Sequence, residues 1–110
     1  MREYTTPTET LIIPGYSLSN AQEIFVTFSD KFRKKNVTIT SDDGIVVEDD
    51  TNGAILYVDL TQEQTAMFRP RDTIDVQVNW ITETGKRLAT EVAQIPCWEN
   101  LLKEVIGDND

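Results

Sequence analysis

Residues 73–82 restrict the fold of this chain more than any other segment. Apolar and polar residues alternate there: the apolar ones are Ile74, Val76, Val78 and Trp80, and the polar ones between them are Asp75, Gln77 and Asn79. Alternation with a period of two predicts a β-strand with one buried and one solvated face. We therefore expect Trp80 and its apolar neighbours to lie in the core of a β-sheet protein.

Residues 54–60 show the same pattern, which predicts that Leu56, Val58 and Leu60 point inward and Tyr57 and Asp59 outward. Other short segments are rich in β-branched or aromatic residues, as is typical of strands. They are residues 9–13, 24–29, 37–40, 45–48 and 88–95. Together these segments predict about seven strands.

Turn residues separate the predicted strands: Pro14-Gly15, Asp42-Asp43-Gly44, Asn52-Gly53 and Thr84-Gly85. Asn-Gly favours a tight hairpin because both residues tolerate positive φ. We therefore expect neighbouring strands to pair antiparallel.

The alternation stops between residues 61 and 67, where Thr61 and Gln64 have the spacing of a helix capping box. This spacing predicts one helical turn. After Pro96, five apolar residues follow at helical spacing, namely Trp98, Leu101, Leu102, Val105 and Ile106, and Gly107 stands where a C-terminal cap would. We expect residues 98–106 to form a short terminal helix or an arm, and residues 107–110 a frayed end.

So short a helix is marginal alone, so the apolar stripe must pack on its own domain or on a neighbour. Trp98, a large aromatic at the start of this stripe, is either docked on its own domain or an interface anchor. All five apolar residues of the stripe are candidate interface residues.

Many short strands with turns between them and little helix favour an all-β fold, an antiparallel immunoglobulin-like sandwich of two sheets. Residues 1–110 have the length of one domain. The Cys-Trp-Cys pattern of antibody domains is absent, since Cys97 is the only cysteine.

Charge and residue content exclude several classes of function. The net charge of −9 repels phosphate backbones and anionic lipids, so neither nucleic acid nor a membrane is an expected partner. The chain has no histidine and one cysteine, which leaves no disulfide, zinc cage or histidine-dependent triad. We expect no enzyme activity and no cofactor, and we expect Cys97 to be a small buried apolar residue.

One acidic segment has the spacing of a calcium loop, with Glu48, Asp50, Asn52, Gly53 and Asp59 at its ligand positions. Strand-like flanks and the wrong first and last residues favour an acidic hairpin tip over a metal site.

Turn chemistry also explains the adjacent carboxylates Asp42 with Asp43 and Asp49 with Asp50 better than catalysis does. The basic residues 33–35 are expected in a solvated loop or on a hairpin shoulder.

Several segments together resemble small proteins encoded in the tail and baseplate gene regions of phages and prophages of Gram-positive gut bacteria. The segments are residues 5–11, 24–28, 60–68, 75–81, 84–90 and 100–102. These proteins are similar in layout to the immunoglobulin-like N-terminal domain of phage baseplate upper proteins. The resemblance implies a virion part that contacts other tail proteins.

Two functions follow as hypotheses. The first is a phage or prophage structural protein of the tail or baseplate, an interaction module that contacts other virion proteins and copies of itself. The alternative is a β-sandwich that binds a carbohydrate or host-surface ligand through residues 42–44 or 48–53. With no signal peptide and no apolar run of membrane-spanning length in the sequence, we expect the protein in the host cytoplasm during assembly and then in the virion.

Overall fold

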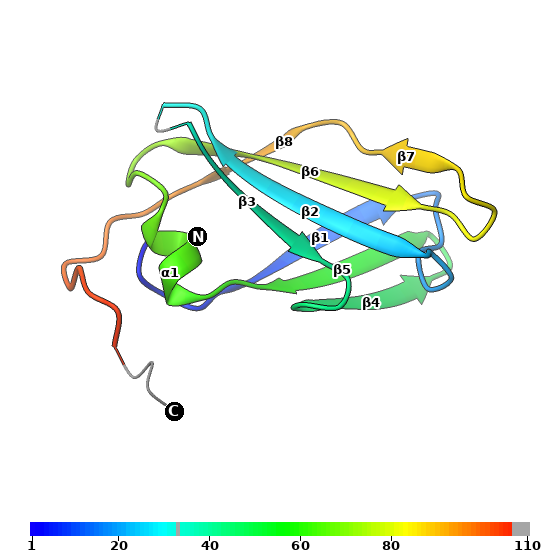
Figure 1. Cartoon of the computed structure of the whole chain (residues 1–110), viewed down its shortest axis with the longest axis horizontal. Helices are drawn as coiled ribbons and strands as arrows, with labels where there is room; N and C mark the ends of the chain where they lie inside the picture. Colours follow the sequence, from blue (N-terminus) through cyan, green and yellow to red (C-terminus); the bar gives the residue numbers. More distant parts are fainter. Residues whose placement is uncertain (33, 107–110) are drawn as a thin grey trace.

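Two antiparallel β-sheets lie face to face in the computed structural model, which describes residues 1–32 and 34–106 (Figure 1). The smaller sheet has the order β1 (Thr8–Pro14), β5 (Gly53–Asp59) and β4 (Ile45–Asp50). The larger has the order β3 (Lys35–Thr40), β2 (Glu23–Asp30), β6 (Thr73–Ile81) and β7 (Arg87–Ala89), and β8 (Ala93–Pro96) also pairs with β6. The predicted all-β sandwich is confirmed.

The strand order is that of an immunoglobulin-like sandwich from which the first strand is missing. In chain order, β1 to β6 take the places of strands B, C, C′, D, E and F, and β7 with β8 takes that of G. In the described part of the chain no strand pairs with the outer edge of β1, where strand A would lie. Residues 1–3 instead run parallel to the chain after β8, where Arg2 forms a single bridge with Trp98.

The core lies between the sheets and consists of the side chains that the alternation assigns to it. Leu56, Val58 and Leu60 are buried, as is the apolar face of β6, while Asp59 is exposed. Trp80 is 2% exposed, which confirms its predicted place in the core. The Tyr16 ring meets it edge to face with ring centroids 5.2 Å apart.

The strand predicted over residues 88–95 is two short strands, β7 and β8. Both pair with β6, with Ala89 opposite Asn79 and Ala93 opposite Val76. Residues 90–92 therefore face only residues 77 and 78, so the chain holds one extra residue, as in a β-bulge. At this point the hydroxyl of Thr90 accepts a hydrogen bond from the Val78 N–H, which a regular ladder would give to a backbone carbonyl.

The predicted helical turn is α1 (Gln62–Ala66), which joins β5 to β6. Its capping box is present: the Gln64 N–H donates to the Thr61 hydroxyl, and the Thr61 N–H donates to the Gln64 amide oxygen. Thr65 is fully buried, and its hydroxyl bonds the backbone of Thr5. This contact connects the first residues of the chain to α1.

Of the two forms expected for residues 98–106, the structure shows the arm and not the helix, because the backbone of this segment is irregular. We call residues 98–106 the terminal arm; Gly107, the expected cap, and the frayed end lie outside the described residues. The polar groups of the arm bond to distant residues instead of forming helical turns: the backbone of Ile106 pairs with the side chain of Gln62. Among the described residues, no helix has the length and apolar character needed to cross a membrane.

Candidate functional site

The terminal arm exposes most of the apolar residues predicted to form an interface. Leu101 is 92% exposed, Trp98 54%, Ile106 51% and Leu102 48%, while Val105 is half-buried. The N-terminus and the arm lie at the same end of the sandwich (Figure 1). The structure therefore gathers the five candidates on one segment, and leaves four of them largely uncovered.

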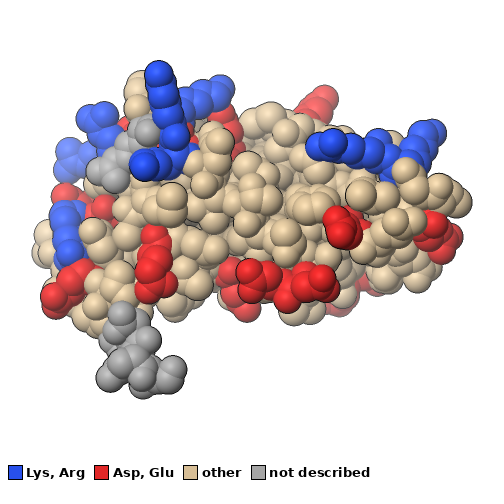
Figure 2. Space-filling model, viewed as in Figure 1, with Lys and Arg blue, Asp and Glu red and all other residues tan. Residues whose placement is uncertain are grey.

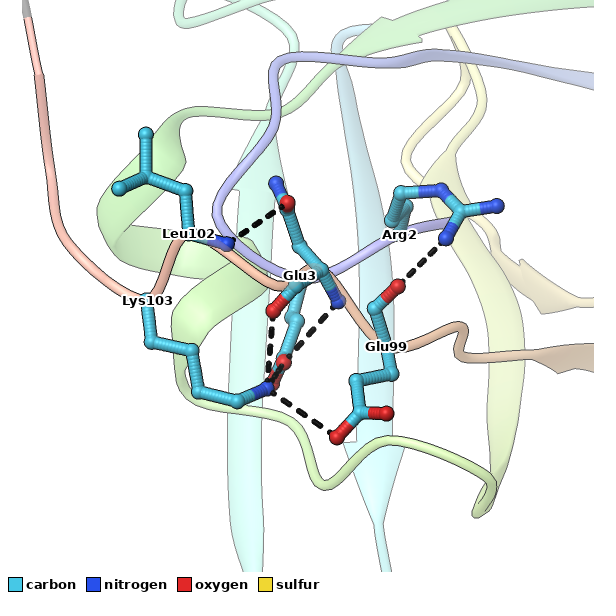
Figure 3. A network of polar contacts seen from close by, with 6 residues as sticks. Arg2, Glu3, Glu99, Leu102 and Lys103 are labelled. Carbon is cyan, nitrogen blue, oxygen red and sulfur yellow. Dashed lines mark hydrogen bonds and ion pairs between the residues drawn. The ribbon is translucent and has the colours of Figure 1, made fainter.

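A network of polar contacts holds the base of the arm against the first residues (Figure 3). The ammonium of Lys103 bonds the carboxylate of Glu3, which is 4% exposed, and also donates to the Asn100 carbonyl at 2.9 Å. The Asn100 N–H donates to the same Glu3 carboxylate at 3.2 Å. On the other side, the Arg2 guanidinium donates to the Glu99 carbonyl. The hydrogen bond and negative charge of Glu3 raise the pKa of Lys103, which favours the charged form of the ammonium.

Gln62 of α1 holds the far end of the arm. Its amide oxygen accepts from the Ile106 N–H at 2.8 Å, and its amide nitrogen donates to the Ile106 carbonyl. These two bonds imitate the pairing of a neighbouring strand. The arm is thus fixed at both ends by polar groups while its apolar side chains face solvent.

Trp98 is docked on its own domain through its backbone and also exposes its side chain as an interface anchor would, so it fits both roles considered from the sequence. Its backbone is docked on its own domain, because its N–H donates to the Met1 carbonyl at 2.9 Å and its carbonyl accepts from the Glu3 N–H at 3.0 Å. Its indole remains more than half exposed. The arm carries no thiol, imidazole or hydroxyl, so the chemistry it offers is apolar contact with polar groups at both ends.

A second candidate is a groove on the outer face of the larger sheet. Its volume is about 360 Å³, and it is lined by Phe25, Thr27, Thr38, Asn79, Trp80, Ile81 and Arg87. In Figure 2, which shows this face, the middle is free of charged side chains, while Lys and Arg lie near its upper ends and Asp and Glu along its lower margin. The groove thus combines an aromatic ring, hydroxyls, an amide and one guanidinium.

No sequence motif predicts this groove. Its best signal was Phe25, an aromatic residue that alternates with the buried Ile24 and Val26 and so points outward. The register that brings Thr38 beside Thr27, with 3.1 Å between their hydroxyls, can be read only from the paired strands.

The calcium-loop residues lie on a β-hairpin, which contradicts the loop geometry. Glu48 accepts a hydrogen bond from the Tyr57 hydroxyl at 2.9 Å, and Asp50 accepts one from the Asn52 N–H at 2.7 Å. Asp59 lies at the other end of β5 from Gly53 and accepts from the Thr8 hydroxyl. No group of metal-ligating side chains occurs among residues 1–32 and 34–106.

The adjacent carboxylates serve loop structure. Asp49 accepts hydrogen bonds from the hydroxyls of Ser17 and Ser19 and from the Leu18 N–H, and these bonds hold its pKa far below that of a free aspartate. Asp49 thereby ties the loop after β1 to β4. Asp42 and Asp43 lie exposed in the turn between β3 and β4, as predicted.

Cys97 is fully buried, and burial raises the pKa of its thiol. This confirms the prediction that it is a small buried residue. Lys34 lies exposed where the chain turns from β2 to β3, Lys35 lies exposed as the first residue of β3, and Arg33 lies outside the described residues.

Comparison with known proteins gives no relative. No protein-family model matches the chain, no curated protein matches it, and no solved structure matches it.

Proposed function

We propose that this chain is a phage or prophage structural protein, a tail or baseplate component whose activity is protein–protein contact. The observation that carries the proposal is the terminal arm, with Leu101 at 92% exposure between two polar anchor points. Clustered uncovered apolar side chains mark contact surfaces. The resemblance to proteins of phage tail and baseplate gene regions supports the proposal that the arm makes its contact within a virion.

The geometry of the arm suits binding by packing. Fully burying a leucine or isoleucine side chain contributes about 1.5–3 kcal/mol, so covering several of them is enough to anchor a partner. Because Glu3 and Gln62 already restrain the arm, less conformational entropy is lost when the partner binds. The proposed partners are other virion proteins, and the proposal involves neither catalysis nor a cofactor.

Peptide mass spectrometry of phage-like particles, purified after induction of the strain that encodes the chain, tests this proposal. We expect enrichment in particles over soluble lysate. A chain carrying Leu101→Asp and Leu102→Asp should be lost from particles, whereas Val46→Asp, an exposed apolar residue on β4, should not. A wild-type chain that stays in the lysate while other tail proteins are enriched would overturn the proposal.

The groove on the larger sheet favours a second candidate function, binding of a carbohydrate or host-surface ligand. An aromatic ring beside hydroxyls and an amide suits a sugar, which has apolar faces and polar edges. This site differs from the loops 42–44 and 48–53 suggested by the sequence. A glycan array separates the candidates: a ligand bound by the wild type should be lost with Phe25→Ala and retained with Lys86→Ala, which alters a residue outside the groove lining. An array without binding would remove this candidate.

A further inference from the structure

The outer edge of β1 carries backbone groups that no strand of the described chain uses. The Leu60 N–H donates to the Pro7 carbonyl and the Gly15 N–H donates to the Asn52 carbonyl, each at 3.0 Å. These two bonds show that odd-numbered residues of β1 face β5. Because the direction alternates along a strand, the N–H and C=O groups of Thr8, Thr10 and Ile12 point away from the sheet.

This edge lacks the charges that protect the other sheet edges. Acidic residues surround β4, including Asp42, Asp43, Glu48 and Asp50, and β3 begins beside Lys34 and Lys35. Residues 10–13 of β1 are uncharged, and Ile12 is 71% exposed. Since proteins usually block a free edge with charges or proline, an open edge of this kind is a template for another strand.

A groove beside β1 opens onto the core where strand A would lie. It has a volume of about 220 Å³ and runs between β1 and the bulge that separates β7 from β8. Its apolar lining includes Leu11, Ile13, Val76, Val78 and Ala93. A strand added to β1 would satisfy the free backbone groups and also cover this groove.

We propose that β1 pairs antiparallel with β1 of a second copy about a two-fold axis near Leu11. In that register Thr10 of each copy exchanges both backbone hydrogen bonds with Ile12 of the other. The N–H of Thr8 also reaches the carbonyl of Pro14, whereas the carbonyl of Thr8 gains no backbone donor at that position because proline has no N–H. The two Leu11 side chains meet over the grooves of both copies.

Self-pairing fits this edge better than a foreign strand because the edge is self-complementary. A two-fold axis brings donors opposite acceptors without any further requirement on the sequence. Residues 10–13 are uncharged, while Glu9 on β1 and Glu91 in the lining of the groove place negative charge beside the contact. The inference rests on the proposed function, since it names one partner of the interaction module, and it leaves the terminal arm free for another.

Light scattering and sedimentation equilibrium between about 10 μM and 1 mM protein test the pairing. The wild type should dimerise, and more strongly at about 0.5 M salt than at 0.05 M, because salt screens the repulsion between acidic copies. Thr10→Pro removes an outward N–H, and Ile12→Lys places two like charges on diagonal neighbours, so each should weaken the dimer at least tenfold. Val46→Lys, the same charge change at an exposed position on β4, should leave the dimer intact.

Monomeric wild type throughout this range would overturn the inference, as would dimers that persist in both β1 variants. Loss of the dimer in the Leu101→Asp variant would also overturn the inference, because it would show that the copies associate through the terminal arm. Ile12→Lys changes an exposed side chain, so we expect this variant to melt like the wild type. A matching melting curve shows that its lower oligomeric mass results from weaker pairing and not from unfolding. A monomer that still enters particles contradicts the pairing alone, whereas a dimer absent from particles contradicts the proposed virion function.

Discussion

Replacing Thr65 with valine should remove a buried connection between α1 and the first residues of the chain. The Thr65 hydroxyl donates to the Thr5 carbonyl at 2.9 Å and accepts from the Thr5 N–H at 3.0 Å. Valine keeps the shape but leaves both backbone groups without this partner. Each unpaired buried polar group costs about 1–3 kcal/mol, and because Thr5 is only half-buried the lower half of this range applies. We expect Thr65→Val to lower the free energy of unfolding by about 2–4 kcal/mol, which lowers the Tm by about 10–20 °C.

Urea denaturation followed by the fluorescence of Trp80 and Trp98 measures this loss. Thr65→Ser keeps the hydroxyl and removes one methyl group, so it should cost about 1 kcal/mol. Thr27→Val is the matched control, because the Thr27 hydroxyl meets only the Thr38 hydroxyl on an exposed face, and it should change stability by less than about 0.5 kcal/mol. If Thr65→Val is as stable as Thr27→Val, or no worse than Thr65→Ser, the hydrogen bonds to Thr5 do not hold these residues together.

Three further outcomes follow from single contacts. Because its hydrogen bonds lower the pKa of Asp49 below the free value of about 3.9, the wild type has their stabilisation above that pH and loses it as pH falls through the folded pKa. Asp49→Asn should therefore melt below the wild type at neutral pH, with a gap that narrows on acidification; a gap independent of pH would contradict this. Burial raises the pKa of Cys97, so a thiol reagent should label the native protein far more slowly than the unfolded protein, and equal rates would show that the thiol is accessible. Lys103→Gln removes the charge paired with buried Glu3, so chymotrypsin should cut the arm at Leu101 or Leu102 faster than in Lys86→Gln; equal rates would show that this pair does not hold the arm.

The sheets could be predicted from the sequence because each strand carries its own two-residue period. The inward faces of β5 and β6 and the capping box of α1 depend on residues next to one another, and these predictions were confirmed. The bulge between β7 and β8 was missed because one extra residue appears only when Ala89 and Ala93 are counted against β6. Strand existence is thus a local property here, and strand register is not.

The sequence left helix and arm open for residues 98–106 because the backbone there does not depend on neighbouring residues. The apolar residues of the arm have helical spacing, but its backbone is held by Glu3 and Gln62, which lie far away in the sequence and compete successfully with a marginal helix. The calcium-loop spacing at Glu48 and Asp59 is already less favoured by the sequence than a hairpin, and the pairing of β4 with β5 shows that hairpin, which carries the two residues apart. The groove at Phe25 could not be predicted from the sequence, because its lining comes from three paired strands, β3, β2 and β6.

The parallel contact between residues 1–3 and the chain after β8 also decides how the domain bears load. The Met1 amino group donates to the Pro96 carbonyl, the Trp98 N–H to the Met1 carbonyl, and the Glu3 N–H to the Trp98 carbonyl. Because the two segments run in the same direction, a force between residue 1 and the arm shears these bonds together and does not open them one after another. A partner that pulls on the arm therefore meets the resistance of the whole contact at once, and the domain yields abruptly when that contact breaks.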